Sequence, residues 1–250
     1  DLGLTKEAQE VYKRLNLSHP ETVAGDLGLA RLDWLEKGDP RGPLKRLELP
    51  PSRISGLNTT DKGALYNALA RYALYSKDFT LAKISAQRAY ETDPKPIGTR
   101  YHYALALINS DSLERQTLDS LLEGLSLDAP REPDVLMLRG LYAKASGDLN
   151  AAVGFFNDAI TVDGAYFHAQ LFLASLYLEA PNIPKAFERF NALLAYAPTI
   201  WDDHPARDDT TPMFRYEESL LKRIDTLSEA EVDSDRKFMA KGLKIGRAHV

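Results

Sequence analysis

The feature that most constrains the fold is an internal repeat of 34 residues. Two consecutive segments, 133–166 and 167–200, align without a gap. A fixed period of this length indicates an array of similar units, each of which buries its apolar face against the next. Counted from the first residue of a segment, the matching positions are 8, 20, 24, 27 and 32, filled by Gly140, Ala152, Phe156, Ala159 and Gly164 and then by Ala174, Ala186, Phe190, Leu193 and Pro198.

The same pattern extends toward the N-terminus into segments 99–132 and, after a slip of two residues, 63–96. Pro94, Pro130, Gly164 and Pro198 therefore mark four successive repeat ends. Positions 7, 8, 20, 24 and 27 hold Leu69, Ala70, Ala82, Ala86 and Ala89 in the first repeat and Leu105, Ala106, Leu118, Leu122 and Leu125 in the second.

The residue types favour a pair of antiparallel helices in each repeat. Small residues at positions 8 and 20 allow two helices to approach closely, and a bulky residue at position 24 fills the seam between them. The dipeptides Lys77-Asp78, Gly147-Asp148 and Pro181-Asn182 are turn signals between the two helices. A proline after the second helix ends it, because proline cannot continue a helix. The sequence thus predicts an all-α chain, and an irregular helix bundle that imitates the period is the alternative.

The pattern resembles the tetratricopeptide repeat (TPR) family over residues 63–200. The closest match runs from Gly140 through Gly147-Asp148 to Ala159, although Arg139 stands where the family has leucine and no tryptophan occupies position 4. The resemblance implies a right-handed superhelical solenoid of antiparallel helix pairs with a C-terminal capping helix. It also implies a protein or peptide partner bound in a concave groove lined by the first helix of each pair.

Residues 1–62 are expected to form a degenerate N-terminal helical repeat and a loop. We predict one helix over Lys6–Leu15, a second that ends at Lys37, and a short one over Pro43–Leu47. An eroded fifth repeat would span about residues 24–57, and Pro50 to Thr60 would be a loop.

Residues 201–250 are expected to form an acidic loop, capping helices and a tail that has the look of a cloning remnant. Ser228 and Glu231 fit a capping box at the start of a last helix. A final amphipathic helix would cover the exposed end of the array. Its apolar stripe would consist of Met213, Tyr216, Leu220, Leu221 and Ile224.

The composition excludes several functional classes. The net charge is −5 and there is no long basic run, which argues against nucleic acid as the main partner. The chain has no cysteine, so disulfides and thiolate sites are impossible. No apolar stretch reaches the roughly 20 residues of a membrane span. Because the chain starts at Asp1 and lacks cysteine, we expect a periplasmic or membrane-associated protein with a removed N-terminal segment in preference to a cytoplasmic one.

Catalysis is not expected, and no cofactor is implied. The sequence has no glycine-rich phosphate loop, paired-histidine zinc motif or nucleophile elbow. The best enzyme-like cluster surrounds His204, with Asp202, Asp203, Asp208 and Asp209 nearby. Acidic residues in a loop before a helix are usually solvated, so metal binding there is the minor alternative. His102 lies at a packing position of its repeat.

The resemblance places positions 2, 5, 9, 12 and 13 of each repeat on the concave face. The alternative for the apolar members is packing within the superhelix. One subclass of the family, which clamps C-terminal carboxylates, is excluded in this register, because its basic positions hold Asp134 and Leu138 in the third repeat. The predicted groove consists of Asn67, Arg71, Tyr75, Arg100, Tyr103, Met137, Leu141, Lys144, His168, Leu171 and Ser175.

These observations lead to a scaffold or adaptor as the expected function, by analogy in the assembly of a bacterial envelope complex of the pilus or secretion type. Three alternatives stay open. The first is that the chain is a helical repeat domain of a larger machine. The second is a metal-dependent enzyme centred on His204, and the third is a homo-oligomer joined through its terminal helices.

Overall fold

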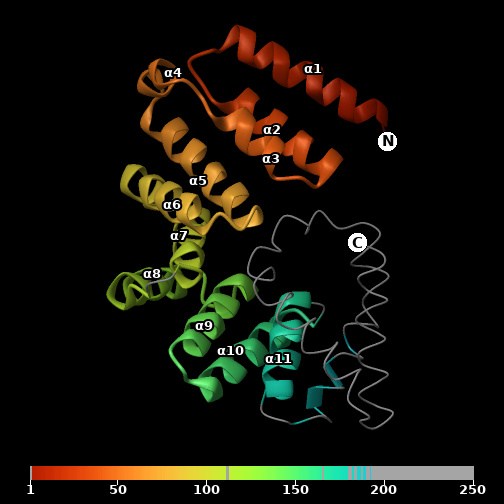
Figure 1. The fold of residues 1–250 in the computed structure, drawn as a ribbon, viewed down its shortest axis with the longest axis vertical. Coiled ribbons are helices and arrows are strands. Elements are labelled where there is room, and N and C mark those ends of the chain that lie inside the picture. The colour runs from red at the N-terminus through yellow and green to blue at the C-terminus, as the bar shows by residue number, and fades with distance from the viewer. Residues whose placement is uncertain are drawn as a thin grey trace. The chain divides into compact units, whose positions relative to one another are not determined.

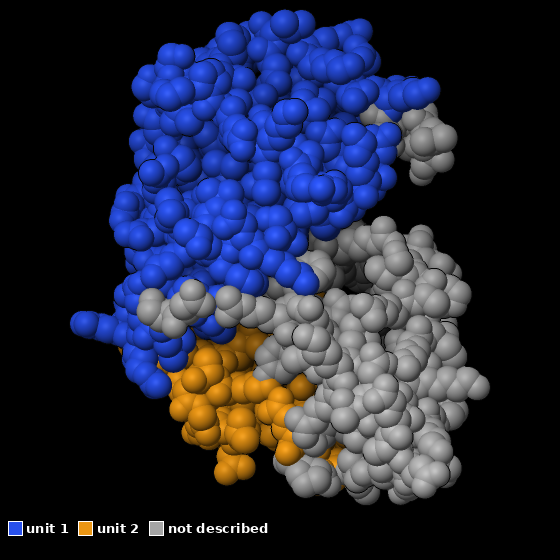
Figure 2. Space-filling view, viewed as in Figure 1, with its two compact units in different colours: residues 1–121 blue, residues 122–250 orange. Residues whose placement is uncertain are grey.

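The structure is a computed structural model, and it describes residues 2–110, 113–164 and 166–179, with residues 182, 185–186, 188–189 and 192. All regular structure in these described residues is helical. The chain divides into two compact units, residues 1–121 and 122–250, which Figure 2 colours separately. The boundary falls inside the helix α8, which spans Arg115–Asp128. Each unit is described below by itself.

Unit 1 contains seven complete helices within the described residues, drawn in Figure 1 from red to yellow-green. They are α1 (Leu2–Ser18), α2 (Ala24–Lys37), α3 (Arg41–Leu47), α4 (Pro51–Gly56), α5 (Thr59–Tyr75), α6 (Phe79–Thr92) and α7 (Ile97–Ile108).

Unit 2 continues from the second part of α8, whose leucines Leu122 and Leu125 are buried. Its complete helices in the described part of the chain are α9 (Pro133–Ala145), α10 (Leu149–Val162) and α11 (Phe167–Glu179).

The repeat turns take the form that the sequence predicts. α5 packs on α6 in unit 1, and α9 packs on α10 in unit 2. The two turns use left-handed backbone at equivalent places, with φ of 61° at Lys77 and 87° at Gly147. The next residue caps the second helix in each pair, because the side chains of Asp78 and Asp148 both accept a backbone N–H bond of 2.9 Å. The prediction of helix pairs is therefore confirmed.

Close packing accounts for both the glycine at position 8 and the phenylalanine at position 24 of the third repeat. A Cβ atom added at Gly140 on α9 would lie 2.4 Å from the Phe156 ring on α10. Phe156 is fully buried, and its ring stacks on Phe172 of α11 with centroids 5.6 Å apart. Only glycine at position 140 therefore lets α9, α10 and α11 close around these two rings.

The N-terminal region is more helical than the sequence predicted. α1 extends beyond both ends of the expected helix 6–15. A short helix, α4, occupies part of the stretch that was expected to be a loop. Pro51 stands at the first turn of α4, where its fixed φ suits a helix and its missing N–H costs nothing. The sequence signal was misread because two adjacent prolines also mark loops.

Three aromatic rings form the centre of the core of unit 1. Trp34 on α2 stacks on Tyr75 of α5 with centroids 4.8 Å apart and planes 13° apart. The plane of the Tyr72 ring makes an angle of 56° with the Trp34 ring and of 68° with the Tyr75 ring, and Tyr72 is fully buried. Leu47 and Leu57 close the cluster from the segments on either side of α4. This core fixes the N-terminal helices onto α5.

A buried carboxylate links three N-terminal helices. Asp26 on α2 accepts hydrogen bonds from Asn16 on α1, at 3.0 Å, and from Arg53 on α4, at 2.5 Å. Its side chain is only 8% exposed, so the cationic partner is needed to offset the cost of burying the charge. A Cβ atom at Gly25 would lie 2.2 Å from the Asn16 side chain, which shows how closely α1 and α2 approach.

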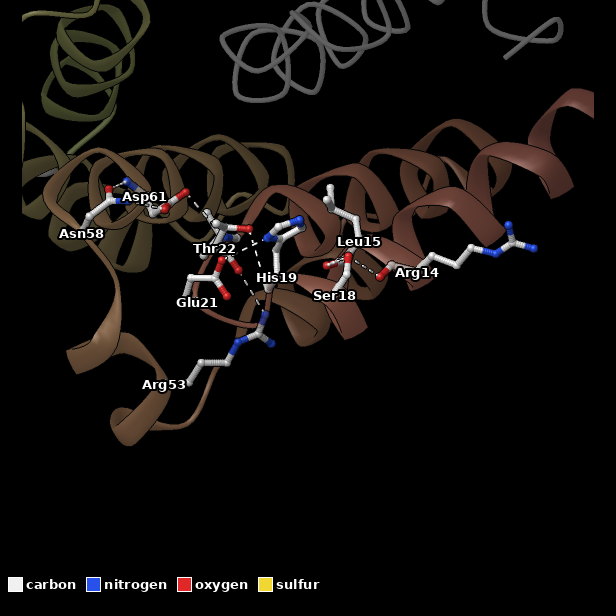
Figure 3. Close-up of polar contacts among 10 residues, drawn as sticks. Arg14, Leu15, Ser18, His19, Glu21, Thr22, Arg53, Asn58 and Asp61 are labelled. Carbon is white, nitrogen blue, oxygen red and sulfur yellow. Dashed lines mark hydrogen bonds and ion pairs between the residues drawn. The ribbon is translucent and has the colours of Figure 1, made fainter.

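The turn between α1 and α2 is tied to the later helices as well (Figure 3). Arg53 donates to the Thr22 carbonyl at 3.3 Å, and the Val23 N–H donates to Asp61 of α5 at 3.5 Å. Asn58, the N-cap of α5, accepts from the Asp61 N–H at 2.8 Å. These contacts join α2, α4 and α5 into one polar edge.

Among the described residues, no helix combines the length and the apolarity needed to cross a lipid bilayer. The expected acidic loop, capping helices and tail of residues 201–250 lie outside the described residues.

Candidate protein-binding surface

In unit 1 the first helices of two successive pairs, α5 and α7, lie side by side. Asn67 on α5 meets His102 on α7, with 2.9 Å between Asn67 Oδ1 and His102 Nδ1. The Asn67 amide nitrogen also lies 3.7 Å from the place that a Cβ atom at Gly98 would occupy. This is an ordinary van der Waals distance, so the Asn67 side chain packs beside Gly98, one turn before His102.

His102 is held neutral in this contact. The pKa of His102 is lowered to about 3, mainly by burial and also by the nearby positive charge of Arg71, while a hydrogen bond with the Gly98 backbone acts in the opposite direction. A neutral imidazole donates through one nitrogen and accepts through the other. With Asn67 Oδ1 as the acceptor, Nδ1 is the donor. His102 therefore has the packing role that its position predicted.

Arg71 is held against the aromatic core. Its guanidinium donates to the Tyr72 hydroxyl at 3.1 Å and lies 4.9 Å from the centroid of the Tyr72 ring. Arg71 is half-buried, as are Asn67, Arg100 and His102. Arg100 on α7 donates to the Lys95 carbonyl at 3.3 Å. We refer to Asn67, Arg71, Arg100 and His102 as the α5–α7 surface.

Two other predicted groove residues of unit 1 lie in packed positions. Tyr75 is 4% exposed and stacks on Trp34 of α2. Tyr103 is 6% exposed, and its ring lies 5.5 Å from that of Tyr90 on α6. Burial raises the pKa of Tyr103, and the charge of Glu114 adds to that rise. The structure thus brings Asn67 and Arg71 to His102, and it places Tyr75 and Tyr103 against neighbouring helices.

In unit 2 most predicted groove residues are also buried. Lys144 on α9 forms an ion pair of 3.0 Å with Glu179 of α11, and its side chain is 16% exposed. The remaining five are buried. They are Met137, Leu141, His168, Leu171 and Ser175, which we refer to as the α9–α11 face.

Tyr166 covers one end of the α9–α11 face. Its hydroxyl donates to the Asp134 carboxylate and lies 3.5 Å from the Met137 sulfur. The Tyr166 ring is also 5.7 Å from that of His168. Burial raises the pKa of Asp134, and the Tyr166 hydroxyl opposes that rise. Sequence reasoning missed Tyr166, because position 34 carries no signal of its own in a single sequence.

Metal binding finds no support in the part of the chain that the structure describes, where no three His, Asp or Glu side chains are grouped to hold an ion. The cluster around His204 lies outside the described residues.

No protein-family model matches the sequence, and a search of curated proteins gave no match. Solved structures do match the fold. A TPR protein of Thermus thermophilus, TTC0263, is 19% identical with a TM-score of 0.58, over 76% of this chain and 98% of that one. The pilF protein of Pseudomonas aeruginosa is 14% identical with a TM-score of 0.52, over 96% and 98% of the two chains.

A third solved structure, a double mutant of MamA RS-1, is 14% identical with a TM-score of 0.51, over 71% of this chain and 98% of that one. At these identities the likeness concerns the fold and not the function. The chain has an all-α, TPR-like solenoid fold.

Proposed function

We propose that the chain is a non-catalytic protein–protein interaction scaffold that binds an extended peptide or a helix along the first helices of its repeats. The observation that carries the proposal is the α5–α7 surface, where Asn67, Arg71 and His102 converge from two adjacent first helices. In TPR folds these helices line the concave face.

The chemistry of the α5–α7 surface suits a peptide with hydrogen-bond acceptors. Arginine is enriched among the residues that dominate binding energy at protein interfaces. Arg71 and Arg100 both carry guanidinium groups, which bind carboxylates and carbonyls in a fixed geometry. The neutral amide of Asn67 adds a group that can both donate and accept.

The rest of the predicted groove takes part in a different way. Tyr75, Tyr103 and the α9–α11 face are buried, so they support the shape of the helices. Substitutions at these residues would change folding, so their effects on binding could not be read separately. Arg71 and Arg100 are the better probes, because both are half-buried and neither belongs to the aromatic core itself.

A selection experiment tests the proposal without knowledge of the partner. Random peptides of about 16 residues, long enough to span adjacent repeats, are displayed and selected on the full chain. The affinities of the enriched peptides are then measured by titration calorimetry. We expect Arg71→Glu and Arg100→Glu each to weaken binding about tenfold, which corresponds to about 1.4 kcal/mol.

The matched control is Arg88→Glu, which makes the same charge change on the second helix α6, where Arg88 is exposed. Its binding should stay within about twofold of the parent, since exposed charges remote from an interface contribute little. Enriched peptides that bind all three variants as tightly as the parent would contradict the proposed site. Circular dichroism and thermal melting establish that each variant is folded.

We further propose that the bound partner belongs to a bacterial envelope complex of the pilus or secretion type. The absence of cysteine suits an exported protein, which then has no thiol that mispairs. Fractionation of the source cells tests this: recovery with the periplasm or the membranes supports it, and recovery with the cytoplasm contradicts it.

A further inference from the structure

The two ends of the Asn67 side-chain amide have different surroundings. The oxygen meets His102 of α7, with 2.9 Å between Asn67 Oδ1 and His102 Nδ1. The nitrogen, Nδ2, has no hydrogen-bond partner among the residues that the structure describes, and it does not belong to the buried polar atoms that lack a partner, so solvent reaches it. One end of the amide is therefore fixed, and the other carries two N–H groups that are free to donate.

His102 determines which end of this amide faces outward. A neutral imidazole carries its proton on one ring nitrogen, and the hydrogen bonds of the ring select which one. With Asn67 Oδ1 as the acceptor, Nδ1 carries the proton and donates to it. In the other tautomer Nδ1 would accept, and the amide would have to turn Nδ2 toward the ring. His102 is thus a positioning residue for the two Asn67 donors.

The free donors of Asn67 suit one class of acceptor. The amide carries no charge, whereas Arg71, one turn further along α5, provides the cation that an acidic side chain requires. A neutral acceptor that every residue of a peptide supplies is its main-chain carbonyl. Carbonyls inside a helix already accept an N–H bond from four residues further on, whereas those of an extended segment are free. An extended segment therefore matches the Asn67 donors better than a helix does.

We propose that Asn67 donates to a main-chain carbonyl of a partner bound in an extended conformation, and that His102 holds the amide in the donating orientation. This inference rests on the proposed function, and it narrows the partner from a peptide or a helix to an extended segment. Main-chain hydrogen bonds contribute affinity whatever the side chain at that residue. The α5–α7 surface then tolerates sequence variation at the partner residue that Asn67 contacts.

Amide-to-ester substitution in a bound peptide locates the carbonyl. Each peptide bond of a peptide selected on the full chain is replaced in turn by an ester, whose carbonyl is a weaker acceptor, and affinity is measured by titration calorimetry. We expect a position at which the ester weakens binding about fivefold, while alanine at that residue leaves the affinity within about twofold. A peptide with no ester-sensitive position, or one that becomes helical on binding, overturns the proposal.

Three variants assign the ester effect. Asn67→Asp keeps an oxygen for His102 but has no N–H to donate, so it should bind the peptide about tenfold more weakly and lose the ester effect. His102→Phe keeps a ring that cannot hold the amide, and the ester effect should fall below about twofold. Gln87→Glu, the matched control on the exposed side of α6, should leave both quantities unchanged. A parent-sized ester effect in Asn67→Asp overturns the proposal, and the same result in His102→Phe overturns the positioning role.

Nitrogen NMR of His102 tests the orientation without a partner. Long-range proton–nitrogen spectra of the full chain at pH 7 should show the Nδ1–H tautomer, and the Nε2–H tautomer overturns the proposal. A failure of the proposed function is distinguishable, because no selected peptide would then respond to Arg71→Glu or Arg100→Glu. A failure of this inference alone leaves those two responses intact and removes only the dependence of the ester effect on Asn67.

Discussion

Asn67 on α5 and His102 on α7 meet at 2.9 Å across two successive first helices, at positions 5 and 4 of their repeats. The position that the resemblance assigned to the concave face thus forms a contact between repeats. One consequence is that the local register of unit 1 and its candidate binding surface depend on the same side chains. Another is that a half-buried imidazole, held neutral, lies beside the arginine proposed to bind a partner.

The depressed pKa of His102 predicts a loss of stability in acid. The unfolded state takes up a proton below pH 6.5, whereas the folded state resists protonation down to about pH 3. The contribution of neutral His102 to the free energy of unfolding is fully present above pH 6.5. It is lost between pH 6.5 and about 3, at up to about 1.4 kcal/mol per pH unit.

His102→Gln keeps a neutral polar side chain at every pH, so it serves as the comparison. Urea unfolding at pH 7 and pH 5 should show the parent losing about 2 kcal/mol more than the variant over this interval. A parent and a variant with the same pH dependence would show that the surroundings of His102 do not lower its pKa.

Two helical glycines of unit 2 predict opposite effects of the same substitution. A methyl group at Gly140 would overlap the Phe156 ring, so Gly140→Ala should lower the free energy of unfolding by about 2 kcal/mol. A methyl group at Gly154 on α10 would meet no atom within 4 Å, and Gly154→Ala should raise stability by up to about 1 kcal/mol. Chemical denaturation of both variants measures the two signs. A neutral or stabilising Gly140→Ala would contradict the packing of α9 on α10.

Asp134 predicts a pH effect of the opposite kind. Burial raises the pKa of this carboxyl, so the stability associated with its protonated form is lost as pH rises through the folded pKa. Asp134→Asn removes the charge and keeps an oxygen that accepts from Tyr166. The free energy of unfolding of the variant minus that of the parent, measured with urea, should be larger at pH 7 than at pH 4. The same difference at both pH values would argue against a buried Asp134.

The two arginine–aspartate pairs of the N-terminal region should differ in importance. Arg53→Met leaves Asp26 buried without its cation, and we expect a loss of about 3 kcal/mol. Arg41 pairs with Asp39 at 2.8 Å on the surface, where its side chain is 85% exposed. Arg41→Met should leave the melting temperature unchanged. Equal effects of the two substitutions would mean that Asp26 reaches water.

Much of the helical framework could be predicted from the sequence, because repeated small residues and turn signals report local packing. The turns at Lys77 and Gly147 and the pairing of α9 with α10 followed directly from the period. α4 was missed, because a six-residue helix has no periodicity to detect. The hydrogen bonds of Asp26 with Asn16 and Arg53 could not be predicted for a different reason, because contacts between residues far apart in the sequence leave no local pattern.

The candidate site was less predictable than the fold. Repeat positions indicate which way a side chain projects from its helix, but they do not reveal what else contacts it. Tyr75 took up a place in the aromatic core because Trp34 of the degenerate N-terminal region lies against it. Leu141 and Leu171 are buried although the resemblance assigns their positions to the concave face. The contact that buries Tyr75 comes from outside the repeats, and the 34-residue period does not encode it.

The most direct test of the central claim is hydrogen–deuterium exchange of the full chain with and without a saturating selected peptide. If the chain binds partners through the first helices of its repeats, slower exchange should appear in α5 and α7, and this protection should disappear in Arg71→Glu. Protection confined to the second helices α6 and α10, or the same protection in parent and variant, would contradict the account.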